Sequence, residues 1–242
     1  MTKPFLSVII PAYNEAERIG PTLERVLAWG ECLGQVFDII VVDDGSSDGT
    51  VEIASQFGLP VRVLKNGSNR GKGYSVRHGV LDSRGTYVLF SDADLSTPIE
   101  DYDRLFAAIT AGNDIAVGSR ALKDSNVTRH QPYYREAMGR TFNRIVRGLA
   151  VPGIMDTQCG FKLFKGEAAR ELFAALTTEG FAFDVEVLFV AIRRGFRIAE
   201  VPVTWANDER SSVHAVFDSV RMLRDVVRLR IRHSRWIPGR PA

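Results

Sequence analysis

The stretch Tyr87-Val88-Leu89-Phe90-Ser91-Asp92-Ala93-Asp94 joins a short apolar run to two aspartates that follow it directly. An apolar run of this length predicts a buried strand. Similar β-branched runs occupy 6–10, 39–42, 61–64 and 115–117, with amphipathic stretches between them. Strands that alternate with helices predict an α/β fold, a Rossmann-like and mostly parallel sheet with helices on both faces.

The second half of the chain is less regular. Residues 119–136 are polar and irregular, and we expect a lid over a binding site there. The other expected elements are helices near 136–149, 166–176 and 184–194, strands at 160–164 and 198–203, and a terminal helix. We predict one large domain over 1–212 and a basic amphipathic helix with a tail over 213–242.

Composition narrows the class of protein. The chain has 242 residues, of which 45% are apolar, so it can fill a hydrophobic core and disorder is excluded. No apolar run approaches the roughly 18 residues that span a bilayer, and the first residues lack the pattern of a signal peptide. The two cysteines, Cys32 and Cys159, are far apart, which argues against a disulfide framework or a structural zinc site. We therefore expect a cytoplasmic protein without a membrane-spanning helix.

Charge is unevenly distributed along the chain. Residues 210–242 carry eight basic and two acidic residues, whereas residues 1–209 carry 23 and 27, so the end of the chain should meet an anionic partner. Apolar residues recur there at helical spacing, at Val216, Val220, Leu223, Val227 and Ile231. A parallel stripe of arginines follows them, at Arg221, Arg224, Arg228, Arg232 and Arg235. This pattern predicts a helix lying on an anionic membrane surface; the alternative is that its apolar side packs on the body. Nucleic acid is not expected, because no binding motif accompanies the basic helix.

Two acidic clusters follow predicted strands, Asp43-Asp44-Gly45 and Asp92-Ala93-Asp94. The carboxyl ends of parallel strands face the ligand crevice of such a sheet. Two carboxylates separated by one residue can hold a hard divalent cation, Mg²⁺ or Mn²⁺, which in turn bridges a diphosphate. We therefore expect Asp92 and Asp94 to be metal ligands.

A glycine-rich stretch, Asn69-Arg70-Gly71-Lys72-Gly73, matches neither common nucleotide motif. A P-loop would need a glycine in place of Asn66, and a dinucleotide fingerprint would need one in place of Val76. What remains is a tight turn into a helix. Its amides and Lys72 could meet an anionic ligand, which makes Gly71 and Lys72 binding candidates, or the turn could simply cap the helix.

The segment Pro11-Ala12-Tyr13-Asn14-Glu15 completes a three-part pattern with the two acidic clusters. At their spacing of about 30 and 50 residues, the three resemble the nucleotide-sugar-binding half of the inverting glycosyltransferases of family 2, which have the GT-A fold. The resemblance implies that 1–212 is a GT-A catalytic domain. It also implies nucleotide-sugar contacts for Pro11, Ala12, Tyr13, Glu15, Asp43, Asp44, Gly71, Lys72, Asp92 and Ala93.

Later segments are similar to one branch of that family. Residues 156–164 and 181–186 look like the dolichyl-phosphate β-glucosyltransferases, relatives of the dolichyl-phosphate mannose synthases, and 201–205 continue the match. Three departures stand out. The given sequence starts directly at its first predicted strand, where the glucosyltransferases usually have an N-terminal membrane helix. Ser96 replaces a glutamine of the mannose synthases, and Arg210-Ser211-Ser212 replaces a pattern with glycine and lysine.

The acceptor that this branch implies decides which groups catalysis needs. A polyprenyl phosphate is largely ionised at pH 7, since its second pKa is about 6, so its oxygen can attack without a strong base. Arginines should then hold the acceptor phosphate, and we assign Arg120, Arg135 and Arg210 to it. A sugar hydroxyl would instead need a carboxylate base, for which Asp184 and Asp156 are candidates. The expected catalytic residues are Asp94, Arg120 and Asp184.

These observations predict a metal-dependent transfer of glucose from UDP-glucose to a polyprenyl phosphate of the dolichyl type, at the cytoplasmic face of a membrane. Three alternatives stay open at this point. The donor could be GDP-mannose, or the acceptor could be a soluble hydroxyl compound. The chain could also bind nucleotides or a membrane surface without turnover.

Overall fold

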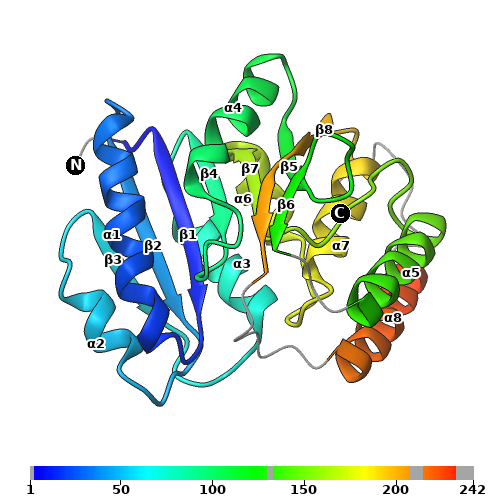
Figure 1. The fold of residues 1–242 in the computed structure, drawn as a ribbon, viewed down its shortest axis with the longest axis horizontal. Helices are drawn as coiled ribbons and strands as arrows, with labels where there is room; N and C mark the ends of the chain where they lie inside the picture. The colour runs from blue at the N-terminus through cyan, green and yellow to red at the C-terminus, as the bar shows by residue number, and fades with distance from the viewer. Residues whose placement is uncertain (1–2, 130–132, 208–214, 233–242) are drawn as a thin grey trace.

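The computed structural model describes residues 3–129, 133–207 and 215–232. Its centre is a seven-stranded sheet in the order β3-β2-β1-β4-β7-β5-β8 (Figure 1). The strands are β1 (Leu6–Ala12), β2 (Phe37–Asp43), β3 (Val61–Lys65), β4 (Tyr87–Ser91), β5 (Ile115–Ser119), β7 (Phe161–Lys165) and β8 (Ile198–Pro202). All neighbouring strands pair in parallel except those next to β7, so the predicted mostly parallel sheet is confirmed.

Helices cover both faces of this sheet (Figure 1). They are α1 (Ala16–Cys32), α2 (Thr50–Ser55), α3 (Lys72–Asp82), α4 (Tyr102–Thr110) after a 3₁₀ turn at Ile99–Asp101, α5 (Tyr133–Leu149), α6 (Gly166–Ala174), α7 (Phe183–Arg193) and α8 (Ala215–Arg232). Successive strand residues point to opposite faces. Ile9 thus belongs to the hydrophobic cluster that contains Val76 of α3, whereas Ile10 belongs to the cluster that contains Leu23 of α1. The predicted two-sided α/β architecture is confirmed.

Strand β7 runs against both of its neighbours. It pairs antiparallel with β4, Ser91 lying opposite Phe161, and antiparallel with β5, Val117 lying opposite Lys162. An antiparallel strand starts at the edge where its neighbours end. The segment before β7 therefore reaches the same sheet edge as the loops that follow β1, β2 and β4.

The irregular segment predicted at 119–136 is only partly irregular. Its residues Asn126–Arg129 form strand β6, which pairs in parallel with β9 (Thr204–Ala206) as a small second sheet. Helix α5 begins at Tyr133, three residues earlier than expected. The prediction of irregular structure was wrong for residues 126–129, because the partner strand of β6 lies more than 70 residues away, where local pattern gives no signal. That this segment forms a lid over a binding site stays a prediction.

Helices α5 and α8 form an outer layer of the molecule and lie side by side (Figure 1). On α8, Met222, Val226 and Leu229 are buried in the main hydrophobic cluster. Val227 and Ile231, which belong to the predicted membrane stripe, are 44% and 67% exposed. The helix therefore packs one apolar stripe on the body and leaves part of a second one at the surface. Of the described helices, none has the length and hydropathy to cross a bilayer.

Candidate active site

The predicted site residues gather at the carboxyl edge of the sheet. Pro11 and Ala12 end β1, and Tyr13 follows with 46% of its surface exposed. Asp43 and Asp44 lie at the end of β2 and are both buried. The Asp92–Asp94 segment follows β4, and Ala93 within it is buried, with its carbonyl accepting a hydrogen bond from the Thr22 hydroxyl at 2.6 Å.

Asp92 is held between the segment before β7 and the start of α3. Its amide donates to the Gly160 carbonyl at 3.1 Å, and its carboxylate lies over Gly160, where any Cβ would overlap it. On the other side, Nζ of Lys72 lies 2.6 Å from Oδ1 of Asp92. That oxygen is buried and accepts no well-aligned hydrogen bond from the described residues. Oδ1 of Asp92 is thus an oxygen suited to a cation, and the Lys72 ammonium lies beside it.

Asp94 and Glu15 share the neighbourhood of Asp92. Oδ1 of Asp94 accepts a hydrogen bond from the Ser96 amide at 2.9 Å. Burial raises the pKa of Asp94, and the Asp92 charge raises it further. Burial also raises the pKa of Glu15. The ion pair with Arg18, at 2.5 Å, lowers this pKa, and the charges of Asp94 and Asp92 raise it. The loops after β1 and β4 therefore converge, as the sequence predicted.

The glycine-rich turn places Lys72 in this site. Gly71 has φ 101°, and a Cβ there would collide with the Glu179 carbonyl, so the turn requires glycine. Lys72 begins α3. Burial alone would lower its pKa, but the carboxylates of Asp92 and Asp184 raise it overall, so Lys72 stays an ammonium ion.

Asp43 and Asp44 use their carboxylates within the protein. Asp44 accepts the Arg70 amide at 2.9 Å and the Gly71 amide at 2.8 Å, and so fixes the glycine-rich turn. Asp43 accepts the amides of Gly45 and Ser46. The predicted contacts of these two residues with a nucleotide stay predictions. Through these hydrogen bonds they stabilise the loops that surround Lys72.

The chemistry of the donor set fits Mg²⁺ or Mn²⁺. Asp92 and Asp94 offer hard carboxylate oxygens, one of them without a hydrogen bond. Across residues 3–129, 133–207 and 215–232, no group of three or more His, Cys, Asp or Glu side chains is arranged to hold a metal ion. A divalent cation with six ligands would therefore need oxygens from a diphosphate and water to complete its shell.

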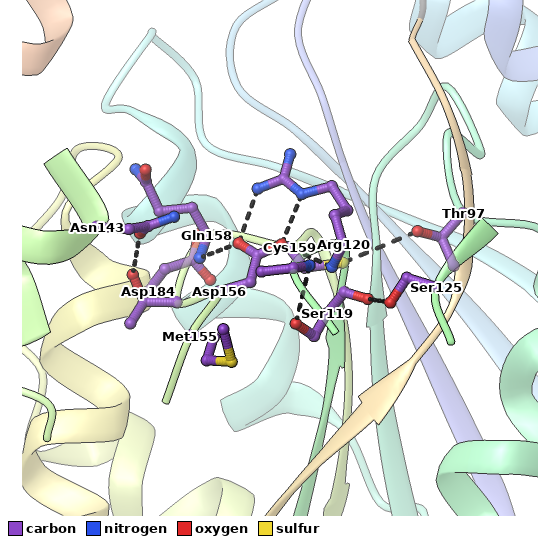
Figure 2. A network of polar contacts seen from close by, with 12 residues as sticks. Thr97, Ser119, Arg120, Ser125, Asn143, Met155, Asp156, Gln158, Cys159 and Asp184 are labelled. Carbon is purple, nitrogen blue, oxygen red and sulfur yellow. Dashed lines mark hydrogen bonds and ion pairs between the residues drawn. The ribbon is translucent and has the colours of Figure 1, made fainter. Parts of the chain in front are cut away.

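Arg120 and Asp156 form a bidentate ion pair at the end of β5 (Figure 2). Nε of Arg120 lies 2.6 Å and Nη2 2.8 Å from the two oxygens of Asp156, and the Arg120 amide donates to the same carboxylate at 3.0 Å. Burial alone would raise the pKa of Asp156, but the guanidinium lowers it overall. The amides of Met155 and Asp156 are held in turn by the Glu200 carboxylate. Asp156 is thus ionised and fully engaged, which makes it a poor general base.

Asp184 is also engaged. Its carboxylate forms a short ion pair with Lys162, and both side chains are buried. Burial raises the pKa of Asp184 overall, although Lys162 and Lys72 each lower it. Lys162 also donates to the Cys159 carbonyl at 2.6 Å. A catalytic contact of Asp184 with substrate stays a prediction.

Two of the predicted acceptor arginines are not described in full. Arg135 lies in α5, but its side chain is outside the described residues, as is the whole of Arg210. Arg120 is the predicted acceptor ligand that the structure describes. Its guanidinium lies 5.3 Å from the centre of the Trp205 ring, at the small β6–β9 sheet.

Sequence reasoning missed three residues that shape the site, Lys162, Glu200 and Gly160. Lys162 is the charged residue between Phe161 and Leu163, and Glu200 likewise interrupts an apolar strand. A charge inside a buried strand needs a partner, and that signal could have identified both. Nothing local marks Gly160, because its role depends on its contact with Asp92.

The outer helices touch the segment that carries Asp156. The hydroxyl of Thr157 donates to Asn143 of α5 at 3.2 Å, and the side-chain amide nitrogen of Gln158 lies 3.1 Å from the sulfur of Met222 on α8. The α5–α8 layer is therefore in direct contact with the segment that follows Asp156.

Comparison with solved structures identifies the fold. The chain superposes on mannosyl-3-phosphoglycerate synthase from Rubrobacter xylanophilus with a TM-score of 0.73 and 20% identity, over 98% of this chain and 79% of the other. It superposes on glucosyl-3-phosphoglycerate synthase from Mycobacterium tuberculosis, in complex with Mn²⁺, UDP-glucose and phosphoglyceric acid, with a TM-score of 0.68 and 19% identity, over 99% and 81%. At these identities the likeness shows the fold alone, and both are GT-A glycosyltransferases.

Comparison of sequences identifies the family. The dolichyl-phosphate beta-glucosyltransferase of Dictyostelium discoideum is 38% identical over 95% of this chain and 75% of its own length. The human protein of the same name is 36% identical over 94% and 75%. The family model for glycosyl transferase family 2 matches residues 7–173, more than half of the chain. The chain therefore belongs to glycosyl transferase family 2 and is a glycosyltransferase of the GT-A fold.

Proposed function

We propose that this enzyme transfers glucose from UDP-glucose to a polyprenyl phosphate of the dolichyl type. The observation that carries the proposal is the state of the two candidate bases. Arg120 binds both carboxylate oxygens of Asp156, and Lys162 pairs with Asp184, so each would act as a base toward a hydroxyl acceptor only against a buried cation. A phosphate acceptor arrives ionised and needs no base. The names of the relatives at 36–38% identity point to the same acceptor.

The donor would lie along the carboxyl ends of β1, β2 and β4. Tyr13, which is half exposed, would contact the base, and Asp92 and Asp94 would hold Mg²⁺ or Mn²⁺ on the diphosphate. When bound there, a divalent cation would offset the negative charge that builds on the departing diphosphate. Lys72, an ammonium ion beside Asp92, adds positive charge at the same place.

The acceptor phosphate would lie beside Arg120. Asp156 engages Nε and Nη2 of the guanidinium and so fixes its orientation, which leaves Nη1 for a phosphate oxygen. We assign Arg135 and Arg210 to the same phosphate. Together these arginines would offset the repulsion between the acceptor and the donor diphosphate. Catalysis then consists of aligning one phosphate oxygen opposite the leaving group.

The α5–α8 layer would bring the enzyme to the lipid acceptor. Among the described residues, no ion pair engages four of its arginines, namely Arg144, Arg147, Arg221 and Arg230. Four apolar side chains of the layer are exposed, namely Ile145, Leu149, Val227 and Ile231. Positive charge next to exposed apolar surface suits the face of a membrane with anionic lipids. We propose that the enzyme binds there, at the cytoplasmic side.

Transfer of labelled sugar into an organic-extractable product tests this function. We expect a lipid product from UDP-glucose and not from GDP-mannose, with polyprenyl phosphate and Mg²⁺, and none after chelation. Asp94→Asn should lower the rate by at least about 100-fold, because it weakens cation binding at the diphosphate. Asp103→Asn, which changes an exposed aspartate of α4, should keep the wild-type rate. Glucose transfer to a soluble hydroxyl compound, with no lipid product, would contradict the proposal.

A further inference from the structure

The charges around Asp92 leave one carboxylate uncompensated. Lys72 pairs with Asp92 and Lys162 pairs with Asp184. Asp94 accepts the Ser96 amide and has no ion-pair partner among the residues that the structure describes. A divalent cation that arrived alone would therefore meet one free carboxylate and a second one already neutralised.

Lys72 occupies the part of Asp92 that a cation needs. Its ammonium lies 2.6 Å from Oδ1, the buried oxygen that lacks a well-aligned hydrogen bond. The other oxygen of Asp92 faces the backbone of Gly160, where a Cβ would overlap it. A cation that coordinates Asp92 through Oδ1 must therefore displace the ammonium, and the two positive charges compete for one oxygen.

A diphosphate would change this competition. Among the described residues, too few carboxylates lie together to complete the coordination shell of a metal ion, so the remaining ligands must come from outside the chain. The Lys72 side chain starts at the first turn of α3, beside amides that favour an anion. A diphosphate in the site would offer the ammonium new oxygens and would release Oδ1 of Asp92.

We propose that Lys72 makes the binding of the divalent cation conditional on the nucleotide diphosphate. Before the donor arrives, Lys72 is the counter-ion of Asp92 and keeps the cation out. With the diphosphate present, the ammonium moves to it and Asp92 joins Asp94 in holding the cation. The inference rests on the proposed function, because it takes a nucleoside diphosphate and a divalent cation as ligands.

Thermodynamic linkage gives this proposal a distinctive signature. In the wild type, UDP should tighten Mn²⁺ binding, and Mn²⁺ should tighten UDP binding by the same factor. Removing the ammonium removes the competitor only in the nucleotide-free protein, because in the complex with UDP the ammonium has already left Asp92. Lys72→Met should therefore tighten Mn²⁺ binding without UDP by about five- to tenfold. It should leave Mn²⁺ binding at saturating UDP unchanged.

The experiment is a titration of Mn²⁺, followed by the electron paramagnetic resonance of the free ion, with and without saturating UDP. Lys72→Arg keeps the charge and should keep the wild-type pattern, and Lys65→Met, on the exposed end of β3, serves as a surface control. Lys72→Gln gives the same prediction as Lys72→Met with a polar side chain, in case the apolar variant does not fold. Circular dichroism checks each variant.

Three outcomes would overturn the proposal. Equal tightening with and without UDP would show that Lys72 repels the cation without moving. Weaker Mn²⁺ binding in both states would show that Lys72 only supports the shape of the site. A wild type that binds no Mn²⁺ even with UDP would overturn the proposed function as well, whereas the first two outcomes leave that function standing.

Discussion

The site at the carboxyl edge of the sheet, here called the inner site, differs from the outer α5–α8 layer in whether its basic side chains have ion-pair partners. At the inner site, Lys72, Lys162 and Arg120 each have an aspartate partner. In the outer layer, Arg221 and Arg230 have no ion pair with any described residue and are exposed. An unpaired buried charge is costly, whereas a hydrated surface charge is not. The inner cations are therefore paired within the protein in the absence of ligand, whereas the outer charges are available to an external partner.

Removing one member of a buried ion pair at the inner site should have the largest effect on stability. Lys162→Met leaves Asp184 buried without a counter-ion, and we expect the free energy of unfolding to fall by about 3–5 kcal/mol. Lys165→Met, on the same strand, breaks a partly exposed pair with Asp114 and should cost less than about 1 kcal/mol. Urea unfolding measures both variants. Similar losses for the two would mean that burial does not distinguish these pairs.

The Arg120–Asp156 pair should give a smaller effect with a clear pH dependence. At pH 7, Asp156→Asn should lower the free energy of unfolding by about 1.5–3 kcal/mol, because a charge-assisted bidentate contact is lost. The pKa of Asp156 is lowered in the folded protein, so this stabilisation is present above the ordinary value of 3.8 and is lost as the pH falls through the folded pKa.

Urea unfolding of the wild type and Asp156→Asn between pH 7 and pH 3 checks this prediction. The difference between the two proteins should be constant down to about pH 4 and should shrink below it. A difference that grows as the pH falls would contradict the ion pair.

Changes in the outer layer should affect binding and not stability. Arg221→Gln combined with Arg230→Gln should weaken binding to vesicles with anionic lipids by about 2 kcal/mol, roughly 30-fold, at about 1 kcal/mol per charge. The free energy of unfolding should change by less than about 0.5 kcal/mol. Arg84→Gln combined with Lys65→Gln removes the same charge from exposed positions elsewhere and serves as the control in vesicle sedimentation. Equal weakening in both pairs would show that only net charge matters.

The proposed donor side of the site was largely predictable from sequence. Asp92 and Asp94 follow an apolar run, and the carboxyl ends of parallel strands share one edge, so their convergence with Glu15 follows from local pattern and fold class. The direction of β7 was not predictable, because it depends on pairing with β4 and β5. The contact between Gly160 and Asp92 could not be foreseen for the same reason.

The C-terminal helix shows a different limit. Its sequence holds two apolar stripes at helical spacing, one through Met222, Val226 and Leu229 and one through Val227 and Ile231. Periodicity predicts a helix from either stripe but does not say which one meets the body. The second stripe was assigned to the membrane, and the structure leaves its last two residues exposed while it buries the first stripe.

The position of β7 has a consequence for synthesis of the chain. Strands β1 to β4 leave the ribosome before residues 161–165, which fill the gap between β4 and β5 in the middle of the sheet. Until then, β4 offers an unpaired edge that ends the first half of the sheet, and such edges can join other chains. We expect the nascent enzyme to depend on chaperones until β7 has been made, and a stalled chain that ends before Phe161 to aggregate.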